Sequence, residues 1–131
     1  MPYVLDTASS LAQVLSHAAR LAPHRVAGYA ANAAFWLAEV RHCFEVLDGY
    51  EMRFRLMADA TDAHVALHPL DPDQQDAADP HTTKKLRDHE LRSARRSVSE
   101  AAGAFFRRCS DLGLLPPELA DPVDELLGLP V

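Results

Sequence analysis

Isoleucine is absent from this chain of 131 residues, so valine and threonine are its only β-branched residues. Only five glycines are present, whereas alanine, leucine and arginine are abundant. Strands are rich in β-branched and aromatic residues, while alanine and unbranched side chains favour helices. The shortage of β-branched residues argues against a sheet and predicts an all-α fold.

Motifs of common enzyme classes are also missing. The chain holds no P-loop, no Gly-x-Gly-x-x-Gly, no Gly-x-Ser-x-Gly and no Cys-x-x-Cys. Its two cysteines, Cys43 and Cys109, fall inside predicted helices and are expected to be buried thiols in a reducing compartment. We therefore predict no catalytic residues and lean against an enzyme.

No apolar run is long enough to span a membrane, and Met1 to Leu5 lacks the basic start of a signal peptide. We expect a cytoplasmic protein without a membrane partner. The length fits a single domain over residues 1–131, and 48% hydrophobic residues are enough to form a core without disulfides.

Periodic apolar residues predict four helices in an antiparallel bundle, followed by a short helical tail. The first helix starts near Asp6 or Ser10, because Ser10 and Gln13 resemble a capping box. Pro23 ends this helix or opens the next. The tail, residues 114–131, contains a helical turn that Asp121-Pro122 caps, Leu126 and Leu127 dock and Gly128 ends.

Glycines and prolines mark the other boundaries. The second helix runs from about Pro23 to Leu47 or Asp48 and ends at Gly49. The third spans about Tyr50–Leu67, unless both form one helix bent at Gly49. A loop covers residues 69–81, and the fourth helix runs from about His81 to Leu112 with Gly113 as its C′ residue.

The second helix carries a heptad seam, a line of apolar residues at alternating steps of three and four. The seam consists of Val26, Ala30, Ala33, Leu37, Val40, Phe44 and Leu47. Glu39-x-x-His42 resembles half of a di-metal site in a four-helix bundle. At 100° per residue, however, both side chains point away from the seam, and no second Glu-x-x-His exists. We interpret this pair as polar residues at the edge of an interface.

The face opposite the seam is apolar near Phe35, and such a helix is buried on more than one side. We expect Phe35, Trp36, Glu39 and His42 to form an interaction surface. Another helix of the same chain or a second subunit would cover it. The leading hypothesis is therefore a protein-interaction module that self-associates, as a homodimer, or binds another protein.

Histidines supply an alternative function. His64 and His68 lie four residues apart, and an i, i+4 pair can chelate a metal from one helix face. A third ligand would come from His42, His81, His89 or an acid. This hypothesis describes a bundle that binds a divalent metal, with or without metal-dependent catalysis. No other cofactor is expected.

Basic residues supply a second alternative. Residues 84–111 hold eight of the 13 lysines and arginines but only four of the 19 acids, whereas the whole chain has a net charge of −6. Arg92, Arg95, Arg96 and Arg107 form a basic face that could follow phosphates. No aromatic residue interleaves with them, so pairing with acids of the same chain is favoured and nucleic acid is an unfavoured partner.

Overall fold

Proline opens four of the five helices. The computed structural model describes residues 2–67 and 80–128; the side chains of residues 2–5, 58, 61–67 and 80–84 lie outside that description. The helices are α1 (Pro2–Arg20), α2 (Pro23–Ala30), α3 (Ala33–Leu67), α5 (Pro80–Asp111) and α6 (Pro117–Leu127). Proline suits the first helical turn because its missing N–H would have no partner there. The described residues contain no strand, and the predicted all-α fold is confirmed.

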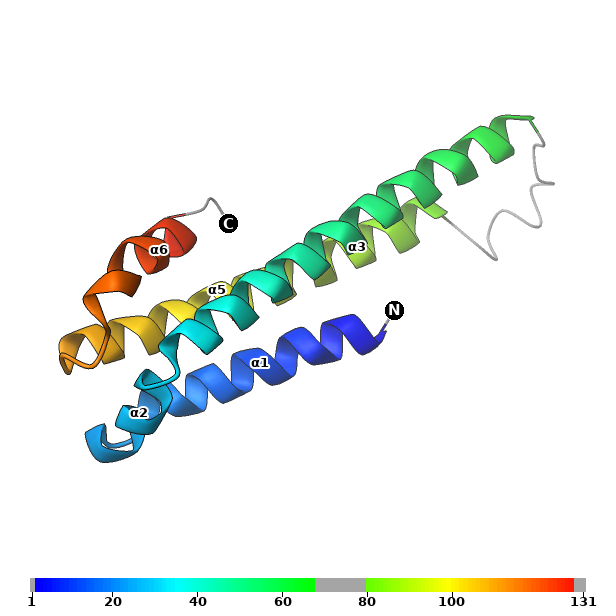
Figure 1. Ribbon diagram of the computed structural model, residues 1–131. Coiled ribbons are helices and arrows are strands. Elements are labelled where there is room, and N and C mark those ends of the chain that lie inside the picture. The colour runs from blue at the N-terminus through cyan, green and yellow to red at the C-terminus, as the bar shows by residue number, and fades with distance from the viewer. Residues whose placement is uncertain (1, 68–79, 129–131) are drawn as a thin grey trace.

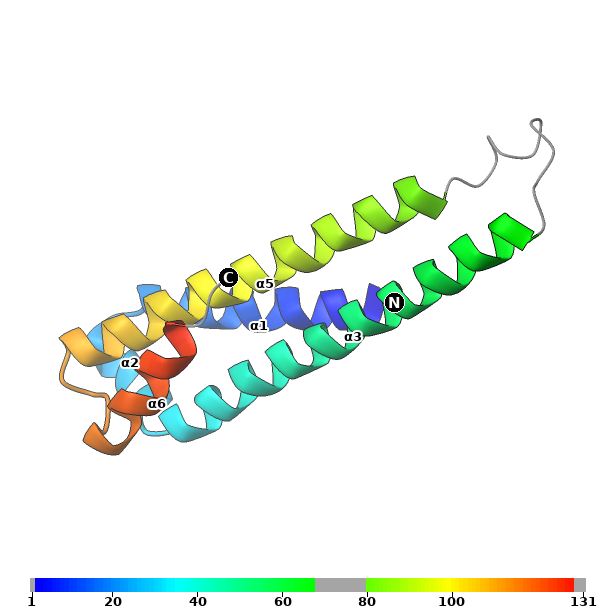
Figure 2. The ribbon, with the colours of Figure 1, turned by 90° about the horizontal axis from the view of Figure 1, so that it is seen from above.

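Three long helices lie side by side (Figures 1 and 2). α1 and α5 run in the same direction and share the most extensive packing, while α3 runs against both. α6 packs across α3 and α5 on the side away from α1. The end of α3 and the start of α5 extend beyond α1 as a pair. An arrangement of four antiparallel helices is thus not confirmed.

Two contacts fix the antiparallel register of α3 and α5. Arg95 of α5 forms an ion pair with Asp48 of α3. Farther along, the guanidinium of Arg87 lies 4.7 Å from the ring centroid of Phe54. Residue numbers therefore rise along α3 as they fall along α5, and positions 48 and 54 face positions 95 and 87.

The core combines small and aliphatic side chains with two aromatic groups, one around Phe105 and the other formed by Tyr50 and Phe54. Its fully buried members come from four helices, and the largest are Leu15, Val26, Val40, Val98, Phe105, Phe106 and Cys109. Every predicted seam residue of the second helix is buried except Phe44, which is half-buried. The adjacent Cys43 takes the buried position instead.

The predicted helix end at Gly49 is wrong, because α3 continues for 35 residues through this glycine. A glycine inside a helix costs about 1 kcal/mol relative to alanine. Tyr50 and Phe54 continue the seam beyond it and are buried. Burying one large apolar side chain contributes about 1.5–3 kcal/mol, so burial of these two rings outweighs the cost.

A break between α2 and α3 was not predicted. Asn32 donates its backbone N–H to the carbonyl of Tyr29 and its side-chain amide to the carbonyl of Gly28. The side chain thus occupies the acceptor that the backbone N–H of residue 32 would use in a continuous helix. Asparagine competes with the helical ladder in this way, which explains the separation of α2 from α3 at residues 31 and 32.

Two further boundaries differ from the predictions. Ser10 and Gln13 lie inside α1, so they do not form a capping box at its start. Asp121-Pro122 likewise lies inside α6, an 11-residue helix that begins at Pro117 rather than a turn capped by Asp121. Leu126 is buried and Leu127 half-buried as expected, but Val123 is buried as well. Gly128 caps the end of α6 as predicted.

Gly113 ends α5 as predicted. It has φ of +67°, and its N–H donates to the Ser110 carbonyl at 3.0 Å. The N–H of Leu114 reaches back to the Cys109 carbonyl at 2.8 Å. These two bonds form a Schellman motif, which needs a residue in the left-handed region at this position. No helix in the described part of the chain is long and apolar enough to cross a membrane.

Candidate functional site

Aromatic rings gather where α2, α3 and α5 meet. Phe105 of α5 is fully buried and lies 6.3 Å from both Tyr29 and Trp36, measured between ring centroids. Trp36 is half-buried and contacts Phe35 edge to face at 5.3 Å. Phe35 itself is 56% exposed. The cluster therefore runs from the core to the surface, and Phe35 is its exposed end.

A hollow of about 590 Å³ opens beside this end of the cluster. Arg25, Gly28, Tyr29, Asn32, Phe35 and Trp36 line it. The break at Asn32 creates this shape, because it changes the path of the chain between Tyr29 and Trp36. Hollows with an aromatic floor and a few polar groups at the rim are typical of sites that accept an apolar side chain. We call Tyr29, Phe35 and Trp36 the aromatic surface.

Glu39 and His42 are both exposed, which confirms that they point away from the core. They lie one and two turns beyond Phe35 on α3, at the edge of the aromatic surface. Charged and polar side chains commonly surround the apolar centre of an interface. Three of the four predicted surface residues are exposed, and Trp36 is half-buried. No helix among the described residues covers Phe35.

The predicted metal site can be assessed only in part. The side chains of His64 and His68 lie outside the described residues. His42 and His89 are exposed on different helices. The α3–α5 register places His89 opposite residues 52–54, so His42 lies about ten residues away along α3, or about 15 Å. The structure does not bring these two histidines together, and no group of three metal-ligating side chains occurs among the described residues.

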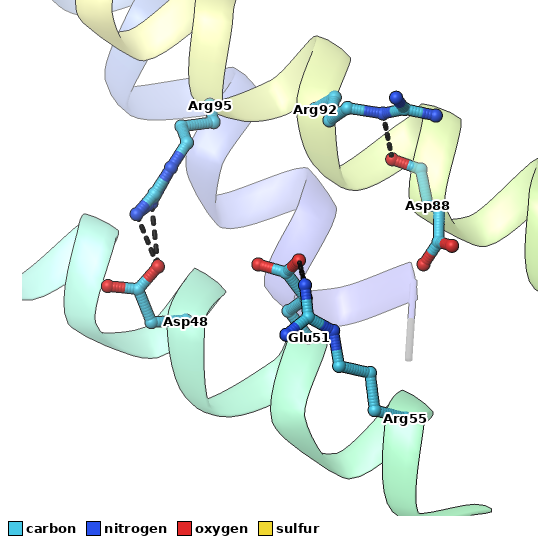
Figure 3. A network of polar contacts seen from close by, with 6 residues as sticks. All are labelled: Asp48, Glu51, Arg55, Asp88, Arg92 and Arg95. Carbon is cyan, nitrogen blue, oxygen red and sulfur yellow. Dashed lines mark hydrogen bonds and ion pairs between the residues drawn. The ribbon is translucent and has the colours of Figure 1, made fainter. Parts of the chain in front are cut away.

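Contacts within the chain engage part of the predicted basic face, and Figure 3 shows those of Arg92 and Arg95. Arg95 donates from Nη1 to Asp48 Oδ1 at 2.8 Å and lies 5.3 Å from the ring centroid of Phe44. Arg92 donates to the Asp88 carbonyl of its own helix. Arg107 donates to the Gly103 carbonyl at 3.0 Å. Of the four arginines, Arg95 forms the expected pair with an acid, whereas Arg92 and Arg107 donate to backbone carbonyls of their own helix, and Arg92, Arg96 and Arg107 are all exposed.

Both cysteines are free and buried, and each has its pKa raised by burial. Nearby Arg95 partly offsets this effect on the pKa of Cys43. Burial also raises the pKa of Tyr50, whose hydroxyl has no hydrogen-bond partner among the described residues. A raised thiol pKa leaves little reactive thiolate at neutral pH, which disfavours a nucleophilic role for either cysteine.

Sequence inspection missed a second group of exposed apolar residues. Met52, Leu56 and Met57 of α3 and Leu86 of α5 are each more than half exposed. All lie in the second half of α3 or the first half of α5. Met52 and Leu56 follow Phe35 at heptad spacing, a signal that was available in the sequence but was overlooked because the helix was expected to stop at Gly49.

Two features of the described chain are best suited to binding. One is Phe35 with the hollow beside it, and the other is the group of exposed apolar residues Met52, Leu56, Met57 and Leu86. They offer apolar contact rather than a cluster of reactive groups. Comparison with known proteins adds no further evidence, because no protein-family model, curated protein or solved structure matches this chain.

Proposed function

We propose that this protein is a non-catalytic interaction module that self-associates through the aromatic surface. One observation carries the proposal: Phe35 is 56% exposed at the end of a continuous ring cluster, beside a hollow with an aromatic floor. Aromatic residues that pair with a pocket are typical anchors of protein interfaces. Packing of Phe35 against Trp36 also holds the side chain in place, which reduces the entropy lost on binding.

Two further observations support an interaction role over the alternatives. Arg95 already pairs with Asp48, so its guanidinium is less available to phosphates. The thiols are buried and have raised pKa values, in keeping with the reducing, cytoplasmic setting that we also propose. No specific observation favours metal binding or nucleic-acid binding, and neither is proposed.

Replacing Phe35 tests this proposal. We expect Phe35→Asp to convert a dimer into a monomer in sedimentation velocity, because a carboxylate would have to be desolvated in the interface. Val14→Asp is the matched control, since Val14 is a 41% exposed apolar residue on α1, away from the aromatic surface. The control should remain dimeric. A dimer that survives Phe35→Asp but not Val14→Asp would contradict the proposal.

A further inference from the structure

The outer face of α3 carries a line of residues at heptad spacing that is apolar at its two ends and polar in its middle. Phe35 and Ala38 stand at its start, Met52 and Leu56 at its end, and His42, Glu45 and Gly49 between them, at alternating steps of three and four. The buried seam of the same helix, which includes Leu37, Val40 and Leu47, lies on the opposite side. At 100° per residue, Phe35 and Leu37 are 200° apart. We call the outer line of residues the outer seam.

Every residue of the outer seam is exposed. Phe35, Met52 and Leu56 are 56%, 65% and 64% exposed, so they present large apolar side chains to solvent. Single exposed apolar residues are common, but here three of them lie on one face of one helix, at the two ends of a line about 32 Å long. Apolar residues at heptad positions are those that contact a second helix in a coiled coil.

Resting on the proposed self-association, we propose that the outer seam of α3 packs antiparallel against the outer seam of a second copy. A register that sets position 42 opposite position 45 of the second copy also sets Phe35 opposite Met52 and Ala38 opposite Gly49. Aromatic rings pack favourably on methionine sulfur, and glycine opposite alanine permits close approach of the two helices. In this arrangement the α3–α5 pairs of two copies form a four-helix assembly.

Charge distinguishes this pairing from a parallel one. In the antiparallel register His42 lies beside Glu45 of the second copy. A parallel pair would place Glu45 against Glu45. Like charges that face each other are unfavourable, whereas opposite charges fix the register. The apolar ends meet in either orientation, so the polar middle of the seam is what favours the antiparallel pair; in this register Leu56 lies opposite residue 31, just before the start of α3 in the second copy.

Directed disulfide formation tests the geometry. Ala38→Cys protein is mixed with Gly49→Cys protein under mild oxidation, and the products are identified by mass spectrometry; the buried native thiols should remain unreacted. Antiparallel packing predicts disulfides between the two different variants. Parallel packing predicts disulfides within each variant alone, and this result would overturn the proposal.

A charge exchange provides an independent test if the cysteine variants fold poorly. We expect His42→Glu to raise the dimer dissociation constant about tenfold, because it would face Glu45 of the second copy. Adding Glu45→Lys should return the constant to near its original value. Failure of this rescue in a protein that still dimerises overturns the antiparallel register but not self-association. If the unmodified protein and all variants are monomeric, both proposals are overturned. A helix of another protein would then be the partner of the outer seam.

Discussion

At the scale of single residues, Phe35 and Trp36 show how one step along a helix changes a side chain's environment. Successive residues differ by about 100° around the helix axis. Trp36 therefore turns toward Phe105 in the core, while Phe35 remains 56% exposed. The sequence pattern predicted that Phe35 lies off the core face. It could not show that no described helix covers this ring, because the paths of the other helices depend on tertiary packing.

Three buried titratable groups predict how stability depends on pH. Burial raises the pKa of Cys43 and Cys109 above the ordinary value of 9.0, and that of Tyr50 above 10.0. The folded protein therefore keeps protons that the unfolded chain releases, so rising pH favours unfolding. We expect the urea midpoint to hold between pH 7 and 8 and to fall as the pH rises above about 9.

Tyr50→Phe separates the tyrosine from the thiols. The variant removes a buried hydroxyl that lacks a partner among the described residues, so its stability at pH 7 should equal or exceed that of the original protein. Its midpoint should also fall less steeply above pH 10. A midpoint that stays constant up to pH 10.5 in the original protein would show that these groups titrate normally.

At the scale of helices, glycine has opposite roles at two positions. Gly49 lies inside α3, and a Cβ at this position would meet no atom within 4 Å. Gly113 has φ of +67° and closes the Schellman motif of α5. Alanine favours the helix interior by about 0.5–1 kcal/mol, but the left-handed conformation costs it about 1–2 kcal/mol.

We therefore expect Gly49→Ala to raise, and Gly113→Ala to lower, the free energy of unfolding by these amounts. Urea titrations followed by circular dichroism, in the Phe35→Asp background, measure the effects without a contribution from self-association. If Gly49→Ala were destabilising in this monomeric background, α3 would not be a regular helix at that position.

Helix content could be predicted from sequence because apolar periodicity and composition are local signals. The ends were harder to predict, and the errors have identifiable causes. Passage of α3 through Gly49 depends on burial of Tyr50 and Phe54, which is a tertiary effect. The break at Asn32, in contrast, rests on a hydrogen bond to Gly28 four residues away, so a local rule about asparagine could have flagged it.

At the scale of the whole molecule, the expected compact bundle disfavoured a long helix, and this assumption hid the outer seam. α3 is about 52 Å long, and its second half extends with α5 beyond α1. Met52 and Leu56 are exposed because they lie on the face of α3 opposite its buried seam. We infer that a second copy covers this surface and supplies the missing helical layer.

Light scattering of the unmodified protein during size-exclusion chromatography tests this central claim most directly. One chain has a mass of 14.4 kDa. We predict a measured mass of twice this value at high concentration, with a shift toward the single-chain mass on dilution. A constant mass of one chain across the whole concentration range would contradict self-association and, with it, the proposed pairing of α3.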